Sequence, residues 1–242
     1  MIRFINFVIF FLISKKFSDP IPETFDARDH WPKINRTVRS ISNCGQTCAL
    51  IQASVVEDRM VVSGCSQGTL SIQDMVSCNR IDDKCNKCNW ENQFLHIRQS
   101  GITTEECLPW VSGDGRVPFC RKVCQNKSPI KRWKVDSITK FTAANVQEEI
   151  MRNGPVSTTF IEYKDLSEYK SGVYTHKTGD EVGKVAAKVL GWGVEGEKKY
   201  WLLQTAWGES FGEKGLLKML RGSNSCGCEE NFVAPVKLCI EG

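Results

Sequence analysis

Several features that would define a special class of protein are missing from this chain of 242 residues. It has no dense run of lysine and arginine, and its formal net charge is only +4, so a nucleic-acid partner is not expected. It has no internal repeat or low-complexity tract, which argues against a solenoid or a disordered protein. Its main apolar stretch, residues 4–13, covers about ten residues and is too short to cross a bilayer, so no stable membrane span is expected in the mature chain.

The apolar stretch at residues 4–13 has basic residues on both sides. This layout is typical of the hydrophobic region of a secretory signal peptide. We expect residues 1–17 to be a signal peptide and the mature protein to follow the secretory pathway, with an extracellular, lysosomal or vacuolar destination. The alternative is that the stretch is a buried strand or helix of the fold. Asn35 and Asn126 each begin an N-x-S/T sequon, which is compatible with secretion, and both are candidates for glycosylation.

Cysteine, in contrast, is abundant, with 12 residues against only three histidines. Cys85 and Cys88 form one C-x-x-C pair, and a zinc site would need a second ligand pair at matching spacing. Cys120 and Cys124 are a candidate second pair, but no histidine pair accompanies them. The even, high count is therefore better interpreted as a disulfide framework formed in an oxidising compartment. No metal and no cofactor is expected.

Hydrophobic spacing predicts helices in the first half of the chain and strands in the second. The expected helices are residues 47–62, 71–78, 89–100 and 143–152. The expected strands are residues 156–161, 185–190, 200–205 and 216–220, separated by glycine-bearing turns. Helices first and strands second indicate an α+β protein. The length is sufficient for one large domain or two packed lobes.

The segment at residues 44–50 carries the most specific signal in the chain. It reads Cys-Gly-Gln-Thr-Cys-Ala-Leu and resembles the active-site segment Cys-Gly-Ser-Cys-Trp-Ala-Phe of papain-like cysteine peptidases. Three further segments are similar to the cathepsin B-like branch of that family: Glu-Asp-Arg at 57–59, Lys-Ser-Gly-Val-Tyr-Thr-His at 170–176 and Leu-Gly-Trp-Gly-Val at 190–194. The resemblance extends from Pro22 to about Ala234.

The resemblance implies a papain-like two-lobe fold, with a helical left lobe, a β-barrel-like right lobe and an inter-lobe cleft. We expect residues 18–242 to form this domain, with the left lobe at about 22–128 and the right lobe at about 129–242, and no pro-segment. By resemblance, the disulfides are Cys44–Cys85, Cys78–Cys120 and Cys107–Cys124. The cysteines without an inherited partner are Cys48, Cys65, Cys88, Cys226, Cys228 and Cys239.

The family's catalytic positions carry other residues in this chain. Aligned without gaps, Thr47 stands at the nucleophile position, Val185 at the histidine position and Thr205 at the asparagine position. A cysteine peptidase needs a thiolate, formed by a neighbouring histidine that a third group orients. Val185 has no titratable atom, and the Thr47 hydroxyl is far harder to ionise than a thiol. Ile41 falls at the offset of the oxyanion glutamine, so the residues predict a pseudopeptidase.

Cys48 is the rival nucleophile. If the helix lost one residue, Cys48 would slide into the nucleophile position, and the chain would be an active cysteine endopeptidase. The Glu-Asp-Arg segment at residues 57–59 would then be displaced by one residue from its position in the family, and no histidine is expected to face the thiol. His30, His96 and His176 are each interpreted as structural, although His176 matches a family histidine nine residues before the catalytic position.

The expected cleft is altered as well. Where the family has Cys-Asn-Gly-Gly, residues 85–88 are Cys-Asn-Lys-Cys, so side chains occupy a wall where glycine permits close approach. A Cys48–Cys88 bridge across the site is one hypothesis. The expected cleft-lining residues are Gln46, Lys87, Cys88, Trp207 and Asn231. Asn231 falls where cathepsin B has its S2 glutamate, so a preference for basic side chains is not implied.

The predicted function is binding of a peptide or protein in this cleft, with inhibitors of active relatives among the candidate partners. A disulfide-rich structural secreted protein is the remaining alternative. The two hypotheses are distinguished by blocking the cleft. For a structural protein, blocking would leave the amount of partner recovered in a pull-down unchanged.

Overall fold

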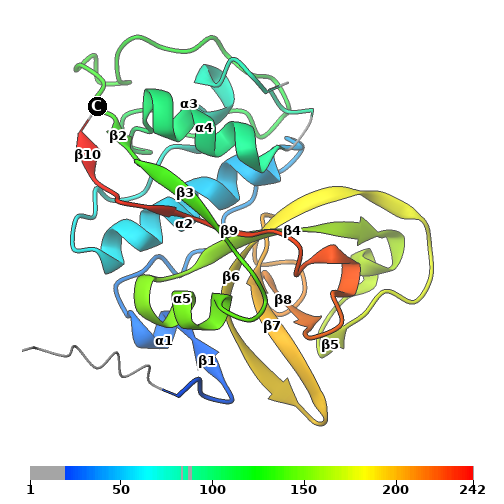
Figure 1. Cartoon of the computed structure of the whole chain (residues 1–242). Helices are drawn as coiled ribbons and strands as arrows, with labels where there is room; N and C mark the ends of the chain where they lie inside the picture. The colour runs from blue at the N-terminus through cyan, green and yellow to red at the C-terminus, as the bar shows by residue number, and fades with distance from the viewer. Residues whose placement is uncertain (1–19, 83, 87–88, 242) are drawn as a thin grey trace, which may run out of the picture.

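The computed structural model describes residues 20–82, 84–86 and 89–241. In Figure 1 a helical part lies above a part built on one large sheet. This mixed content confirms the predicted α+β class. The expected signal peptide at residues 1–17 lies outside the described residues.

Helix α2 (Thr47–Val62) runs through the helical part and is buried on nearly all sides. Apolar residues surround it rather than forming one stripe, which is typical of a helix enclosed by the fold. Just before it, Gly45 donates its N–H to the carbonyl of Cys85 at 2.7 Å, and a Cβ on Gly45 would lie 2.6 Å from that oxygen. Only glycine fits this approach, and the Cys44–Cys85 disulfide joins the same two segments.

Two further helices end at the predicted residues and begin one residue later than predicted, because the predicted first residue is the N-cap in each case. α3 (Ile72–Cys78) follows Ser71, whose hydroxyl accepts a backbone N–H of the first turn. α4 (Trp90–Ser100) follows Asn89, whose side chain accepts two such N–H groups. α4 ends at Gly101, where φ is 78°, a conformation that favours glycine.

The sheet has the strand order β3-β9-β4-β6-β7-β8-β5 among the described residues, with β1 paired to β6 beside this path. Its strands are β1 (Phe25–Asp26), β3 (Ser137–Phe141), β4 (Val156–Tyr163), β5 (Val173–Tyr174), β6 (Glu181–Glu195), β7 (Lys198–Gln204), β8 (Leu216–Leu220) and β9 (Phe232–Val236). Strands β4, β6, β7 and β8 lie where the sequence predicts strands. The sequence does not predict β3, which is short and partly exposed, or β9, which contains Pro235.

Short elements complete the described chain. They are α1 (Ala27–His30), α5 (Val146–Asn153), the 3-10 helices η1 (Lys164–Glu168) and η2 (Ser225–Gly227), and the strands β2 (Trp133–Lys134) and β10 (Ile240–Glu241). The fourth predicted helix corresponds to α5, which starts three residues later than expected. Within the described residues, no helix is both long enough and apolar enough to cross a membrane.

Both ends of the chain cross the lobe boundary that the sequence predicts near residue 128. At the start, β1 pairs with β6, and the ring of Phe25 stacks on that of Trp192 with centroids 5.0 Å apart. At the end, β10 pairs with β2, and a Cys65–Cys239 disulfide joins the C-terminal segment to the loop after α2. Each part is therefore completed by a segment from the far end of the chain.

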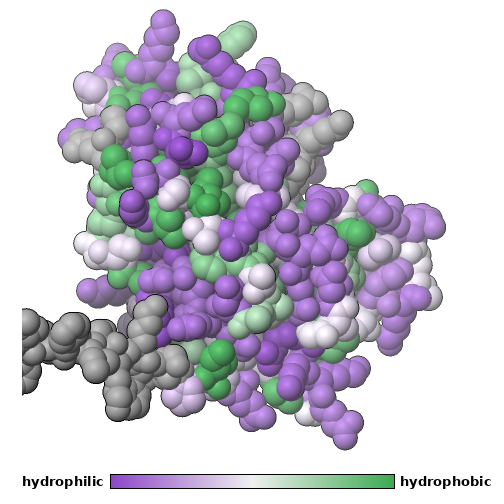
Figure 2. All heavy atoms as spheres, in the orientation of Figure 1, coloured by the Kyte–Doolittle hydropathy of each residue, from purple (hydrophilic) through white to green (hydrophobic). Residues whose placement is uncertain are grey.

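Two hydrophobic cores fill the two parts. The first surrounds α2 and includes Leu50 and Phe94. The second lies in the sheet part and includes Phe160, Trp192 and Trp201. Figure 2 shows that hydrophilic residues cover much of the visible face and that the outline is indented where the two parts meet.

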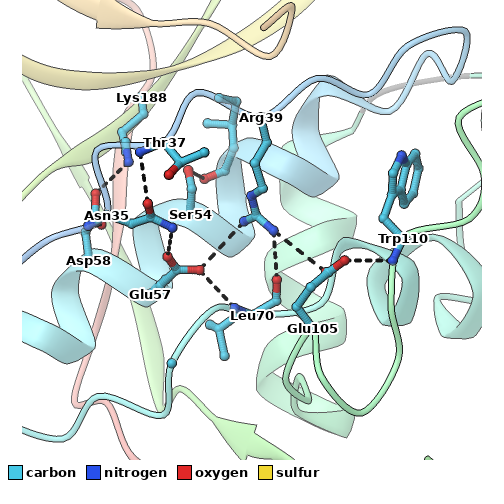
Figure 3. A network of polar contacts seen from close by, with 12 residues as sticks. Asn35, Thr37, Arg39, Ser54, Glu57, Asp58, Leu70, Glu105, Trp110 and Lys188 are labelled. Atoms are coloured by element: carbon cyan, nitrogen blue, oxygen red, sulfur yellow. Dashed lines mark hydrogen bonds and ion pairs between the residues drawn. The ribbon is translucent and has the colours of Figure 1, made fainter. Parts of the chain in front are cut away.

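A buried ion pair joins the helical part to the sheet part (Figure 3). Nζ of Lys188 on β6 lies 2.6 Å from Oδ2 of Asp58 on α2, and the two side chains are 1% and 0% exposed. The other carboxylate oxygen of Asp58 accepts the backbone N–H of Asn35 at 3.1 Å. A buried charge without a partner is strongly unfavourable, so each member of this pair depends on the other.

The same polar cluster extends to Glu57, the neighbouring residue on α2 (Figure 3). Its carboxylate accepts hydrogen bonds from the Asn35 side-chain amide at 2.7 Å and from the Leu70 N–H at 2.9 Å. Burial raises the pKa of Glu57, and the guanidinium of Arg39, 3.7 Å away, opposes that rise. Arg39 also faces Glu105 at 3.8 Å. Asn35 and Arg39 thus fasten the N-terminal segment to the helical part.

Replacing Lys188 with methionine is expected to lower the free energy of unfolding by about 3–5 kcal/mol, because the buried Asp58 carboxylate loses its counter-charge. The double variant Lys188→Met/Asp58→Asn should recover much of this loss, since it removes both charges and keeps an acceptor for Asn35. Urea denaturation measures each value. Lys198→Met, at an exposed position of β7, is the control. An equal decrease in the free energy of unfolding in Lys188→Met and Lys198→Met would contradict the prediction.

Of the two sequons, we expect glycosylation at Asn126 and not at Asn35. Asn126 is exposed, whereas the Asn35 amide nitrogen, the atom that a glycan would occupy, donates to Glu57 at 2.7 Å. In protein made through a eukaryotic secretory pathway, Asn126→Gln should abolish the mobility shift that a deglycosylating enzyme produces. Asn35→Gln should leave that shift unchanged, and its disappearance in this variant would refute the assignment.

Candidate functional site

Thr47, at the expected nucleophile position, is the first residue of α2 and is buried. Its hydroxyl accepts a hydrogen bond from the backbone N–H of Ala186 on β6 at 3.2 Å. These two residues are 139 positions apart in the chain. Since Val185 immediately precedes Ala186, the structure brings the expected nucleophile and histidine positions together.

The side chain of Val185, at the expected histidine position, is a hydrocarbon. It lies opposite Phe160 of β4 in the antiparallel register and belongs to the second core. Trp207 packs against the same core, and its ring meets that of Phe160 edge-on with centroids 6.4 Å apart. A hydrocarbon side chain among apolar neighbours neither accepts nor donates a proton.

Thr205, at the expected asparagine position, is buried and holds a loop closed. Its hydroxyl donates to the carbonyl of Gly215 at 3.0 Å, and its backbone N–H bonds to the same oxygen at 3.0 Å. The residue follows β7 directly, and Trp207 forms a β-bridge with Ser40 two residues later. The hydroxyl of Thr205 therefore serves the local backbone.

The three histidines of the sequence lie elsewhere. His30 is on α1, and His96 is buried on α4, where burial lowers its pKa. The ring of His176 stacks on that of Tyr163 with centroids 3.7 Å apart. Tyr163 lies three residues along β4 from the partner of Val185, which corresponds to about 10 Å of strand. This separation agrees with a structural role for His176.

The described disulfides include the three pairs that the resemblance implies, Cys44–Cys85, Cys78–Cys120 and Cys107–Cys124. The Cys65–Cys239 pair is additional. Because Cys85, Cys120 and Cys124 are bridged, the zinc alternative for these residues is wrong. Among the described residues, no group of three or more histidine, cysteine or acidic side chains is arranged to hold a metal ion.

Cys48, the rival nucleophile, is engaged in a disulfide and is 1% exposed. A sulfur in this state is neither a thiolate nor accessible to a peptide. Cys88 lies outside the described residues, so the Cys48–Cys88 bridge stays a prediction.

A cavity of about 270 Å³ lies where the two parts meet. Its lining residues come from both parts and are Asn89, Trp90, Glu91, Thr159, Lys184 and Asn231. Thr159 and Lys184 are direct neighbours of the paired residues Phe160 and Val185 on their strands. The cavity is therefore adjacent to the place where Thr47 meets β6.

The cavity lining contains one acidic and one basic side chain, Glu91 and Lys184, and Lys140 beside Glu91 adds a second basic one. The carboxylate of Glu91 faces the ammonium group of Lys140 at 3.5 Å, and that ammonium also lies 4.9 Å from the centre of the Trp90 ring. Lys184 is exposed on β6 and lines the cavity together with the neutral Asn231. Such a lining favours a polar or acidic group over a basic one.

The five residues expected to line the cleft differ in where the structure places them. Asn231 lines the cavity, and Trp207 lies partly buried on the second core. Gln46 is fully buried, and its side-chain oxygen accepts from Nε2 of Gln93 on α4 at 3.2 Å, so it lies beneath the surface rather than on it. Lys87 and Cys88 lie outside the described residues. The sequence indicated Asn231 as a cleft residue, but it did not indicate Trp90 or Lys184.

Comparison with known proteins gives consistent results. A family model described as papain family cysteine protease matches residues 21–236. Cathepsin B-like cysteine proteinase 3 of Caenorhabditis elegans is 34% identical over 248 residues, covering 90% of this chain and 66% of that protein. Cathepsin B-like cysteine proteinase 1 of Ostertagia ostertagi is 32% identical over 251 residues, covering 90% and 73%. The chain thus spans 66% and 73% of the length of these two relatives.

Solved structures show the same architecture. Procathepsin B S9 from Trypanosoma congolense aligns with a TM-score of 0.85 and 30% identity, covering 90% of this chain and 78% of that one. Digestive procathepsin L 3 of the Tenebrio molitor larval midgut aligns with a TM-score of 0.75 and 21% identity, covering 93% and 72%. The second likeness concerns the fold alone. The two-lobe arrangement predicted from the sequence is confirmed.

Proposed function

The chain belongs to the papain family of cysteine proteases, in its cathepsin B-like branch, and we propose that it binds peptides or proteins in its cleft without cleaving them. The observation that carries this proposal is the environment of Thr47. Its hydroxyl accepts the N–H of Ala186, and the adjacent side chain on β6 is that of Val185. Cleavage by the family's chemistry needs a thiolate and a base beside it.

The proposal takes Thr47, Val185 and Thr205 as the residues at the family's nucleophile, histidine and asparagine positions. A threonine hydroxyl without a strong base stays protonated, so it does not attack a peptide carbonyl. Ile41, at the offset of the oxyanion glutamine, is buried in the first core. Loss of an oxyanion donor alone lowers the rate by about 10²–10³-fold. Every catalytic part of the family's site is therefore replaced in this proposal.

Two alternatives have less support. An active endopeptidase based on Cys48 requires a reduced, accessible sulfur, and Cys48 is buried and disulfide-bonded. A purely structural, disulfide-rich protein agrees with the described bridges. It gives no role to a charged cavity at the junction of the two parts, whereas peptide binding does.

The ligand that suits the cavity is a peptide segment with an acidic or polar side chain. Lys184 supplies a positive charge, and Asn231 supplies hydrogen-bonding groups without charge. Trp90 offers an aromatic surface beside them. The described disulfides are compatible with an oxidising compartment, and with a signal peptide at residues 1–17 we assign the protein to the secretory pathway, outside the cell or in a lysosome or vacuole.

Purified protein is expected to show no hydrolysis above buffer across a broad set of fluorogenic peptides, because no base activates Thr47. Papain, assayed at the same concentration with the same peptides, is the positive control. An epoxide that alkylates cysteine nucleophiles should label papain and leave this protein unlabelled. Turnover that the epoxide blocks would refute the inactive assignment, and its loss in Cys48→Ser would identify the displaced nucleophile.

Binding is expected to depend on the cavity. Acidic peptides selected from a peptide array should bind Lys184→Glu at least tenfold more weakly than wild type, about 1.4 kcal/mol, since the substitution inverts the charge at the cavity wall. Fluorescence anisotropy measures the Kd of each labelled peptide. Lys198→Glu makes the same change at an exposed position of β7 and should leave the Kd unchanged. Equal effects in both variants would favour the structural alternative.

A further inference from the structure

The turn at residues 225–228, Ser-Cys-Gly-Cys, holds two reduced cysteines two positions apart. Among the described residues, Cys226 and Cys228 are the free cysteines. The N–H of Cys228 bonds to the carbonyl of Ser225 at 3.1 Å, and φ is positive at both central residues, 53° at Cys226 and 71° at Gly227. This is the pattern of a type I′ turn, where cysteine is an unusual residue.

The turn brings the two cysteines within bonding reach. A left-handed turn mirrors the dimensions of the α-helix, in which Cα atoms two residues apart are separated by about 5.4 Å. That separation is inside the range of roughly 4.4–6.8 Å found in disulfides. Burial, followed by the charges of Glu229 and Cys226, raises the pKa of the Cys228 thiol.

The two thiols differ in access to solvent. Cys228 is 0% exposed and belongs to the second core. Its carbonyl accepts a hydrogen bond from the Thr158 hydroxyl at 2.5 Å, which fixes the residue against β4. Cys226 is only partly buried, and its sulfur lies 3.9 Å from the hydroxyl of Ser225. A reagent from solvent therefore meets Cys226 first.

We propose that Cys226 and Cys228 form a redox-active dithiol, which a low-molecular-weight disulfide such as glutathione disulfide oxidises to an intramolecular bridge. The Cys226 thiolate attacks one sulfur of glutathione disulfide, forms a mixed disulfide and expels one glutathione thiolate. The Cys228 sulfur attacks the Cys226 sulfur and expels the second glutathione thiolate, which takes up the Cys228 proton. Two protein thiols are oxidised and one small disulfide is reduced to two thiols, so electrons and protons balance.

The length of the enclosed loop distinguishes this pair from the structural bridges. A Cys226–Cys228 bond would enclose one residue, whereas the described bridges join cysteines separated by 17 to 174 positions. The stabilisation that a disulfide provides grows with the loop it closes. A bridge in this turn adds little stability and is open to reduction by the same small thiols. The pair can therefore cycle, independently of peptide binding in the cleft.

The test uses the full mature protein, isolated with its native disulfides and equilibrated with glutathione buffers of increasing oxidised fraction. After acid quenching and alkylation with N-ethylmaleimide, trypsin releases one peptide, residues 222–237, whose only cysteines are Cys226 and Cys228. In reducing buffer this peptide is expected to carry two maleimide groups. In oxidising buffer it should carry none, lose two hydrogen atoms in mass and retain no glutathione.

Cys228→Ala is the matched control, because it keeps the entry thiol and removes the resolving one. Its peptide is expected to retain one glutathione in oxidising buffer. In Cys226→Ala the buried Cys228 should stay reduced. Near-ultraviolet circular dichroism verifies that each variant folds. If Cys228→Ala does not fold, Cys228→Val takes its place. The proposal is overturned if wild type keeps both thiols in the most oxidising buffer, retains glutathione or forms a disulfide-linked dimer.

The oxidation rate is expected to rise with pH. Burial, together with the charge of Asp165, raises the pKa of Cys226, and hydrogen bonds from Ser225 and the His176 backbone oppose this rise. The titratable side chains around the two thiols are Asp165, Tyr174, Glu229, Glu230 and the His176 ring, which pairs with Asp165. The attacking thiolate is thus a minor species at neutral pH. The rate should increase about tenfold per pH unit between about pH 6.5 and 8.5. A flat profile would exclude Cys226 as the attacking thiol.

Discussion

The Lys188–Asp58 ion pair fixes how α2 lies against β6, and the arrangement of the site depends on that placement. Thr47 starts α2 about three turns before Asp58. Val185 lies three residues before Lys188 on β6. Because both charges are shielded from water, neither element can slide without separating them at a large cost. The contact of Thr47 with β6 and the cavity between α4 and β6 follow from this alignment.

Within that frame, the residues at the proposed catalytic positions contribute to packing. Val185 adds apolar surface to the second core, and Thr205 uses its donors to close a loop. A scaffold needs matched buried charges and filled cores, and it does not need a nucleophile. This accounts physically for a chain that keeps the papain fold with residues unsuited to the family's chemistry. The Cys226–Cys228 dithiol is not among the residues that line the cavity, although Asn231 of the cavity follows Cys228 by three residues.

The helices were predictable because their signals are local. Ser71 caps α3 and Gly101 ends α4 through contacts with neighbours in the chain. Features that depend on distant partners were not predictable. Strand β9 contains Pro235 and is recognisable only through its pairing with β3 and β4, and the partner of Cys65 is set by the path of the C-terminal segment. Likewise, the alignment gives the identities of the site residues, whereas only the fold shows which of them meet.

The exchange of terminal segments between the two parts determines the order in which the protein can be completed during synthesis. A nascent chain that has emerged as far as residue 128 already contains α2, yet the bond of Cys65 awaits Cys239, 174 positions later. The Cys65 thiol must stay reduced, and protected from wrong partners, until translation is nearly finished. β1 likewise has no strand partner until β6 has been synthesised. Neither lobe is an autonomous folding unit, so the molecule gains and loses its structure as a single cooperative body.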